Sequence, residues 1–181
     1  MRRGLKSIWF ASFAIAVVAI AGLVVRDRVV GFAGGRVPAV YVHMNAANSF
    51  LEPVVSIRPG QRVIFVNEDT GPHTVIGFNA RTGREPAYGI NGNVAGTAGP
   101  GHPVSTYAVT LHTPGIYQYY CSVHARLVKT LGESVQVGPR KGIHGFGGVM
   151  AGTIVVTKDP SLLRGNPPST SRKVLPKFFG G

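Results

Sequence analysis

Short runs of β-branched and aromatic residues, bounded by glycine or proline, constrain the fold of this chain most strongly. The seven runs after residue 28 are Val37–His43, Pro53–Arg58, Gln61–Asn67, His73–Phe78, Val104–His112, Gly115–Cys121 and Met150–Thr157. Turn signals such as Pro59-Gly60 and Pro114-Gly115 separate them, and no sustained 3.6-residue apolar period occurs between them. Short strands with this punctuation are typical of a sandwich or barrel. The sequence therefore predicts an all-β domain.

The amino-acid composition excludes several other classes of protein. The 181 residues suffice for one domain with extensions. Hydrophobic residues make up 44% and charged residues 14%, which excludes a disordered chain and a coiled coil. The 25 glycines and 13 prolines lack the Gly-X-Y period of collagen. The single cysteine, Cys121, excludes an intramolecular disulfide framework and any two-thiolate metal site.

The N-terminal segment predicts export. Arg2, Arg3 and Lys6 precede an apolar run of 18 residues, Ile8–Val25, in which Ser12 is the one clearly polar residue. This run is long enough for a hydrophobic helix that crosses a bilayer, with the positive flank on the cytoplasmic side. Two interpretations of residues 1–28 stay open: an uncleaved signal anchor, or a signal peptide cleaved near Ala19-Ile20-Ala21. Either one places the protein at the periplasmic or extracellular face, as a membrane-anchored or a secreted protein.

The charge of the exported part bears on its partners. Residues 1–28 contain five of the 19 basic and one of the seven acidic residues, so the remainder has a net charge of +8. This charge favours an acidic protein partner or an anionic lipid surface. Nucleic acid is not expected as a partner, because the basic residues are scattered along the sequence and no recognition-module signature occurs.

Two segments interrupt the regular strand spacing, and a third closes the chain. Asn79–Pro103 is polar and rich in glycine, and Ala125–Gly148 separates the last two predicted strands. We expect both to be long surface loops, since loops of this length are usually functional or disordered. Residues 158–181 contain four prolines and are expected to form a flexible basic tail. The predicted domain therefore spans residues 37–157.

Four residues with metal-binding side chains lie at the ends of predicted strands. Cys121 ends one strand, His124 follows it in a turn, His73 opens another strand and Met150 opens the last. In a two-sheet sandwich these strand ends can lie at the same pole. Two imidazoles, one thiolate and a weak thioether form the ligand set of a blue-copper electron-transfer site.

Three motifs carry a resemblance to a known family. Residues 57–67 (IRPGQRVIFVN) with His73-Thr74-Val75, residues 114–124 (PGIYQYYCSVH) and residues 150–156 (MAGTIVV) are similar to the cupredoxins, the plastocyanin-like blue copper proteins. The resemblance implies a cupredoxin-like Greek-key β-sandwich, here preceded by one N-terminal hydrophobic helix. It also implies one type 1 copper ion, cycling between Cu(I) and Cu(II), with His73, Cys121, His124 and Met150 as its ligands.

The axial ligand is where the sequence departs from the family pattern. Familiar members place the methionine a few residues after the second histidine, whereas here Ala125–Val149 intervenes. We interpret the interval as an insertion, with Met44 and His144 as alternative axial ligands. Among the other polar residues, His43 and His112 are expected to lie at strand edges, and Thr74 is placed near the thiolate.

The resemblance implies a carrier of single electrons between redox protein partners, and not an enzyme. Copper nitrite reductases and multicopper oxidases need additional histidine clusters, and a binuclear copper centre needs two bridging cysteines, which this chain lacks. If residues 1–28 are not cleaved, the N-terminal helix attaches the protein to the membrane. The alternative function is a copper chaperone or storage module that exchanges its metal.

Overall fold

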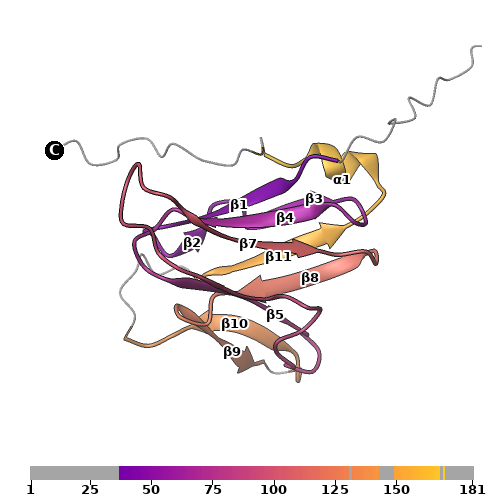
Figure 1. Cartoon of the computed structure of the whole chain (residues 1–181). Coiled ribbons are helices and arrows are strands. Elements are labelled where there is room, and N and C mark those ends of the chain that lie inside the picture. Colours follow the sequence, from indigo (N-terminus) through magenta and orange to yellow (C-terminus); the bar gives the residue numbers. More distant parts are fainter. Residues whose placement is uncertain (1–36, 131, 143–148, 168, 170–181) are drawn as a thin grey trace, which may run out of the picture. The chain divides into compact units, whose positions relative to one another are not determined.

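The computed structural model describes residues 37–130, 132–142, 149–167 and 169, which form two packed β-sheets (Figure 1). The first sheet has the strand order β2-β1-β4-β7 and the second the order β3-β11-β8-β5-β6, while β9 and β10 form a separate pair. The elements are β1 (Val40–Asn45), β2 (Ser49–Phe50), β3 (Val54–Ile57), β4 (Arg62–Asn67), β5 (His73–Phe78), β6 (Asn91–Val94), β7 (Ser105–Thr110), β8 (Gly115–Tyr120), β9 (Ala125–Lys129), β10 (Val135–Pro139), β11 (Ala151–Val156) and α1 (Pro160–Arg164). The predicted all-β cupredoxin-like sandwich is confirmed, and the predicted N-terminal helix lies outside the described residues.

All seven predicted strands are present, with ends shifted by at most three residues and the strand His73–Phe78 predicted without a shift. They form because alternate side chains face the space between the sheets, as β4 illustrates: Val63 and Phe65 are buried, whereas Arg62 is exposed. The pairs β1–β4 and β3–β11 are parallel, and the other pairs are antiparallel. This alternation therefore gives each sheet one apolar face, which packs against the apolar face of the other sheet.

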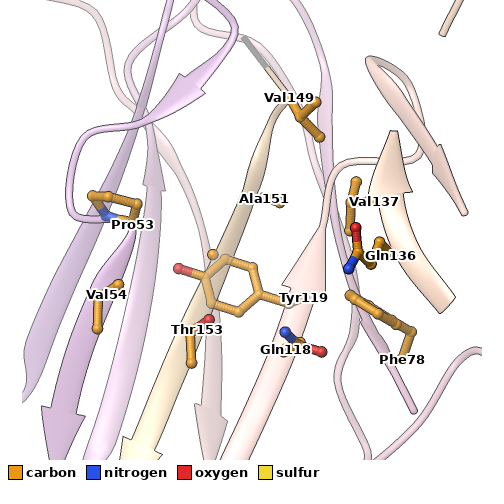
Figure 2. Close-up of a pocket in the computed structure, with 11 residues that line it drawn as sticks. Pro53, Val54, Phe78, Gln118, Tyr119, Gln136, Val137, Val149, Ala151 and Thr153 are labelled. Carbon is orange, nitrogen blue, oxygen red and sulfur yellow. The ribbon is translucent and has the colours of Figure 1, made fainter. Parts of the chain in front are cut away.

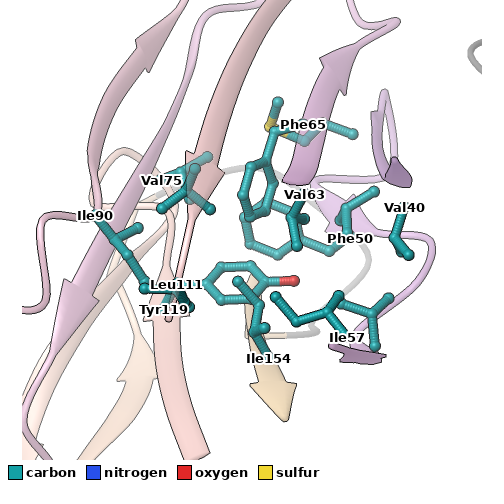
Figure 3. Close-up of a cluster of buried hydrophobic side chains, with 14 of the residues drawn as sticks. Val40, Phe50, Ile57, Val63, Phe65, Val75, Ile90, Leu111, Tyr119 and Ile154 are labelled. Atoms are coloured by element: carbon teal, nitrogen blue, oxygen red, sulfur yellow. The ribbon is translucent and has the colours of Figure 1, made fainter. Parts of the chain in front are cut away.

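Aromatic rings fill the centre of the sandwich (Figure 3). The ring of Tyr119 packs edge-on against Phe50 and Phe65, with centroid distances of 4.9 and 5.0 Å. Its hydroxyl group lies against Gly152, where a Cβ atom would collide with the hydroxyl oxygen. Glycine at position 152 thus lets the large Tyr119 side chain lie across β11.

The segment 79–103, predicted as a loop, contributes a strand to the second sheet. Within it, β6 pairs with β5, although asparagine and glycine make up three of its four residues. Gly92 of β6 lies beneath the ring of Tyr107, where any Cβ atom would collide with the ring. Pairing and packing therefore outweigh the weak strand propensity of β6, and the prediction of a loop is wrong at these residues.

The segment 125–148, also predicted as a loop, contains the antiparallel pair β9–β10. Leu127 of β9 and Val137 of β10 pack on Phe78 and Tyr120, which project from the outer face of the second sheet. Figure 1 shows the pair alongside β5 and β8. The prediction of a loop is wrong here because two alternating apolar side chains per strand give a short and weak sequence signal. The interval between His124 and Met150 includes a folded hairpin.

The C-terminal segment differs in its first part from the expected flexible tail. Asp159 caps α1 by accepting a hydrogen bond from the Ser161 backbone N–H at 2.8 Å, and Pro160 occupies the first turn. Beyond the helix, the Asn166 side chain accepts a hydrogen bond from the Ser56 backbone N–H at 2.7 Å. This contact attaches the residues after α1 to strand β3. Among the described residues, none forms a helix long and apolar enough to span a membrane.

Candidate metal centre

Strand directions bring three chain segments to one edge of the second sheet. The strand β8 is antiparallel to both β5 and β11, with Tyr120 opposite Ile76 and opposite Ala151. The end of β8 therefore lies beside the starts of β5 and β11. Because His73 begins β5, Cys121 follows β8 and Met150 precedes β11, these residues share one pole of the sandwich.

Three of the four predicted ligand residues form a compact cluster at this pole. The Sγ atom of Cys121 lies 3.7 Å from Nδ1 of His73 and 3.4 Å from Nδ1 of His124. The potential ligand atoms of the three residues all lie within 4.8 Å of one another. Cys121 and His73 are buried, whereas His124 is partly exposed. The cluster thus has one member that reaches solvent.

Hydrogen bonds prepare Cys121 to ionise. Burial alone would raise the pKa of the Cys121 thiol, but hydrogen bonds from His73, from the Thr74 backbone N–H and from His124 outweigh burial and lower the pKa to about 6. The Thr74 N–H donates to Sγ at 3.3 Å. The Thr74 hydroxyl group also accepts a hydrogen bond from the Ser122 N–H at 2.7 Å. Thr74 therefore stabilises the thiolate and fixes the backbone that follows it, as the sequence analysis expected.

Asp69 orients the ring of His73. Oδ2 of Asp69 lies 3.0 Å from Nε2 of His73, and an ionised carboxylate can only accept, so Nε2–H donates to it. Burial favours the neutral imidazole, but the hydrogen bonds to Cys121 and Asp69 outweigh burial and raise the pKa of His73. Asp69 is not among the site residues predicted from the sequence. The available signal was a carboxylate four residues before a ligand histidine, in a turn.

The turn before His73 is fixed by a buried amide. The side chain of Asn67 is fully buried and donates to the carbonyl oxygens of Gly71, Val94 and Ala95 at 2.9, 3.2 and 3.0 Å. These bonds connect the end of β4, the turn and the residues after β6. The turn that carries Asp69 is thus tied to both sheets.

Met150 lies directly beside the cluster. Its side chain is 1% exposed, and its carbonyl oxygen accepts a hydrogen bond from the Cys121 N–H at 3.0 Å. Met44, the first alternative, is also fully buried and lies on β1 opposite Asn67. His144, the second alternative, lies outside the described residues. Among these three candidates, Met150 has a direct hydrogen bond to a cluster residue.

His43 differs from the expectation of a polar residue at a strand edge. It is 1% exposed, and its Nδ1 atom lies 3.1 Å from Oε2 of the buried Glu52. The backbone N–H of His43 donates to the same carboxylate oxygen at 2.8 Å. The residue is therefore part of a buried polar pair and not of the cluster. His102 and His112 are exposed and do not belong to the cluster either.

A hollow of about 390 Å³ opens between β3, β10 and β11. Figure 2 shows Thr153, Gln118 and Phe78 around it. None of His73, Cys121 and His124 lines this hollow, so it is separate from the metal-binding cluster.

The two-sheet sandwich and a His₂Cys cluster at its pole define a copper protein of the cupredoxin class. The family described as copper-binding proteins of the plastocyanin/azurin type matches residues 39–132. This match covers more than half of the chain, and the chain belongs to that family. Plastocyanin-like proteins of this class bind copper and transfer electrons. His73, Cys121 and His124 lie within the matched residues, whereas Met150 lies beyond them.

Individual proteins resemble this chain over part of its length. A plastocyanin from Prochlorothrix hollandica is 40% identical over 70 residues, which cover 39% of this chain and 50% of that protein. The chain thus matches about half the length of this relative. Amicyanin from Paracoccus versutus is 23% identical with a TM-score of 0.39, over 67% of this chain and 85% of amicyanin. A purple cupredoxin from Nitrosopumilus maritimus is 15% identical with a TM-score of 0.40, over 65% and 99% of the two chains.

Proposed function

We propose that this protein carries single electrons between redox protein partners through one type 1 copper ion. His73, Cys121 and His124 are the equatorial ligands in this proposal, and Met150 is the weak axial ligand. The observation that carries the proposal is the cluster of two imidazole nitrogens around a buried thiol whose pKa is lowered to about 6. A thiolate with two imidazoles is the donor set that suits copper in both oxidation states.

The atoms of the cluster fit one ion. Metal–nitrogen and metal–sulfur bonds of about 2.0 and 2.3 Å, meeting at roughly 110–120°, separate the two donor atoms by roughly 3.5–3.7 Å. The observed distances from the Cys121 Sγ atom to the two Nδ1 atoms are 3.4 and 3.7 Å. Because Nε2 of His73 donates to Asp69, Nδ1 is the nitrogen available to a metal. The site therefore needs little rearrangement to accept an ion.

When bound, copper supplies a one-electron couple between Cu(I) and Cu(II). The surrounding residues favour electron transfer by keeping the ligands fixed: Asp69 orients the ring of His73, and Thr74 hydrogen bonds the Cys121 sulfur. A ligand set that moves little between oxidation states has a small reorganisation cost. His124 is the partly exposed ligand, so we assign it as the point of electron entry and exit.

The location of the protein and the charge of its partner are also part of the proposal. The apolar run Ile8–Val25 supports export to the periplasmic or extracellular face, either anchored to the membrane by that segment or secreted. The net charge of +8 after residue 28 supports an acidic redox partner. We propose no enzymatic activity, because the donor set is completed by four residues and leaves no ligand position for a substrate.

The main alternative is a copper chaperone or storage module, and retention of copper during redox cycling separates the two. The copper-loaded protein would be reduced and reoxidised repeatedly in the presence of a strong Cu(I) chelator. An electron carrier keeps its copper and regains its visible absorption in every cycle, whereas a chaperone loses copper to the chelator on first reduction. His73→Ala is the matched control, since removing one ligand should release copper while leaving the fold intact.

A further inference from the structure

The hairpin β9–β10 places basic residues next to the partly exposed ligand His124. The pairing of the hairpin runs from Val135–Lys129 to Pro139–Ala125. Ala125 directly follows His124, so the last pair lies at the ligand pole. Continued by one residue, the register therefore directs Arg140 toward the pole that carries His124.

Arg126 and Arg140 lie on the face of the hairpin opposite to its apolar side chains. Leu127 and Val137 pack on the second sheet, and alternation directs Arg126 to the opposite face of the hairpin. Arg140 follows Gly138 by two residues, and Gly138 pairs with Arg126. Arg140 therefore faces the same side of the hairpin as Arg126. Arg126, Arg140 and Lys141 are all exposed and together line a hollow of about 400 Å³. We call this set the basic hollow.

The three positive charges of the basic hollow are not neutralised within the described part of the chain. No ion pair there joins Arg126, Arg140 or Lys141 to a carboxylate. The nearby Glu85 accepts a hydrogen bond from the Tyr120 hydroxyl group, and Arg140 acts electrostatically on that hydroxyl. The hollow therefore presents three basic side chains to solvent, with the carboxylate of Glu85 nearby.

We propose that the basic hollow is the docking surface for an acidic redox protein, whose carboxylates bind Arg126, Arg140 and Lys141 while its redox centre faces His124. This inference rests on the proposed function. Two arginines and a lysine are the side chains that bind carboxylates through charge-assisted hydrogen bonds. The charge complementarity raises the rate of encounter and orients the partner with its redox centre toward the copper site.

The shape of the surface favours a protein partner over a lipid bilayer. A hollow lined by three basic side chains can surround one or two projecting carboxylates, whereas a bilayer presents a flat plane of headgroups to many lysines and arginines. The location also favours a redox partner, because Arg126 of the hollow lies two residues after His124, the cluster residue that is partly exposed.

A charge-neutralised hairpin and a matched control test the proposal. The test variant is Arg126→Gln, Arg140→Gln and Lys141→Gln combined. The control is Arg58→Gln, Arg62→Gln and Lys158→Gln combined, which removes the same charge from exposed residues at the opposite pole. The poles are separated by a six-residue strand, roughly 20 Å. The Debye length is about 10 Å at 0.1 M ionic strength, so the control charges are screened there.

The measurement is the rate of electron transfer from the reduced, copper-loaded protein to succinylated cytochrome c, an acidic redox protein. One electron passes to the ferric haem, leaving Cu(II) and ferrous haem. At about 0.1 M ionic strength we expect the rate to fall about tenfold in the hairpin variant and less than about twofold in the control. With native cytochrome c, which is basic, the hairpin variant should react as fast as the wild type or faster.

Equal rates in the two variants with succinylated cytochrome c would overturn the docking surface and leave the proposed function standing. The docking surface would also be overturned if the hairpin variant keeps the wild-type rate but loses binding to phosphatidylglycerol vesicles. The hollow would then be a membrane-binding surface. If the copper-loaded wild type transfers no electrons to either cytochrome, the proposed function itself fails. The three results are distinguishable in one set of samples.

Discussion

The thiol of Cys121 should be ionised at neutral pH before any metal binds. An ordinary cysteine has a pKa of about 8.5, so about 3% is thiolate at pH 7. The hydrogen bonds from His73, Thr74 and His124 lower the pKa of Cys121 to about 6, which corresponds to about 90% thiolate at the same pH. The ultraviolet absorbance of the thiolate, measured against pH in the metal-free protein, should therefore have a midpoint near pH 6. Cys121→Ser provides the baseline.

The same shift predicts how stability depends on pH. The folded-state pKa of Cys121 lies below the unfolded value, so the unfolded chain binds more protons between about pH 6 and pH 8.5. The thiolate contribution, at most about 3.4 kcal/mol, is fully present above pH 8.5 and is lost as the pH falls toward 6. The raised pKa of His73 acts in the opposite direction, because its contribution is lost as the pH rises.

Urea unfolding of the metal-free wild type and of Cys121→Ser at several pH values tests the predicted pH dependence of stability. The stability difference between the two proteins should increase with pH from 6 to 8.5. A thiolate midpoint at pH 8 or above, together with parallel stability profiles, would refute the reasoning that hydrogen bonds overcome burial at this sulfur.

Four further substitutions, in two pairs, test the axial ligand and the core. Met150→Leu should retain copper and raise the reduction potential, because losing a donor destabilises Cu(II) more than Cu(I). Met44→Leu should leave the reduction potential unchanged. If Met44→Leu raises the potential and Met150→Leu does not, Met44 is the axial ligand. Tyr119→Phe should increase the free energy of unfolding by about 1 kcal/mol, because its buried hydroxyl group has no hydrogen-bond partner among the described residues. Tyr107→Phe should lower it by about 1 kcal/mol, since its hydroxyl accepts from the Asn91 N–H. Chemical denaturation checks both, and a loss of stability in Tyr119→Phe would show that the hydroxyl is satisfied.

The strands that build the two main sheets were predictable because their residues are β-branched or aromatic and are separated by glycine and proline. Strand β6 was not, since Asn91, Gly92 and Asn93 have weak strand propensity. It forms because β5 offers an open edge and Gly92 fits beneath Tyr107, and both conditions depend on residues far away in the sequence. Short strands stabilised by tertiary packing leave little trace in a local pattern.

The cluster was predictable in a different way. Cys121 and His124 are three residues apart at a strand end, and His73 opens a strand that sequence motifs place at the same pole. The role of Asp69 depends on how the turn before His73 folds, and the fold of that turn depends on the buried side chain of Asn67. A turn conformation set by hydrogen bonds to the carbonyl groups of Val94 and Ala95, 27 and 28 residues from Asn67, cannot be inferred from spacing alone.

The hairpin β9–β10 also depends on contacts that a local sequence pattern does not contain. The interval between His124 and Met150 could be identified as an insertion from the family pattern. Its folding depends on Leu127 and Val137 finding an apolar surface on the second sheet. The basic hollow is visible only after the hairpin register has brought Arg126 and Arg140 together.

The visible absorption spectrum of the protein with added Cu(II) tests the central claim most directly. A thiolate bound to Cu(II) gives an intense charge-transfer band, so the wild type should become strongly coloured at one copper per chain. Cys121→Ser should lose the band, because serine cannot supply the soft thiolate donor. A colourless wild type, or a serine variant that keeps the band, would contradict the assignment of Cys121 as a copper ligand.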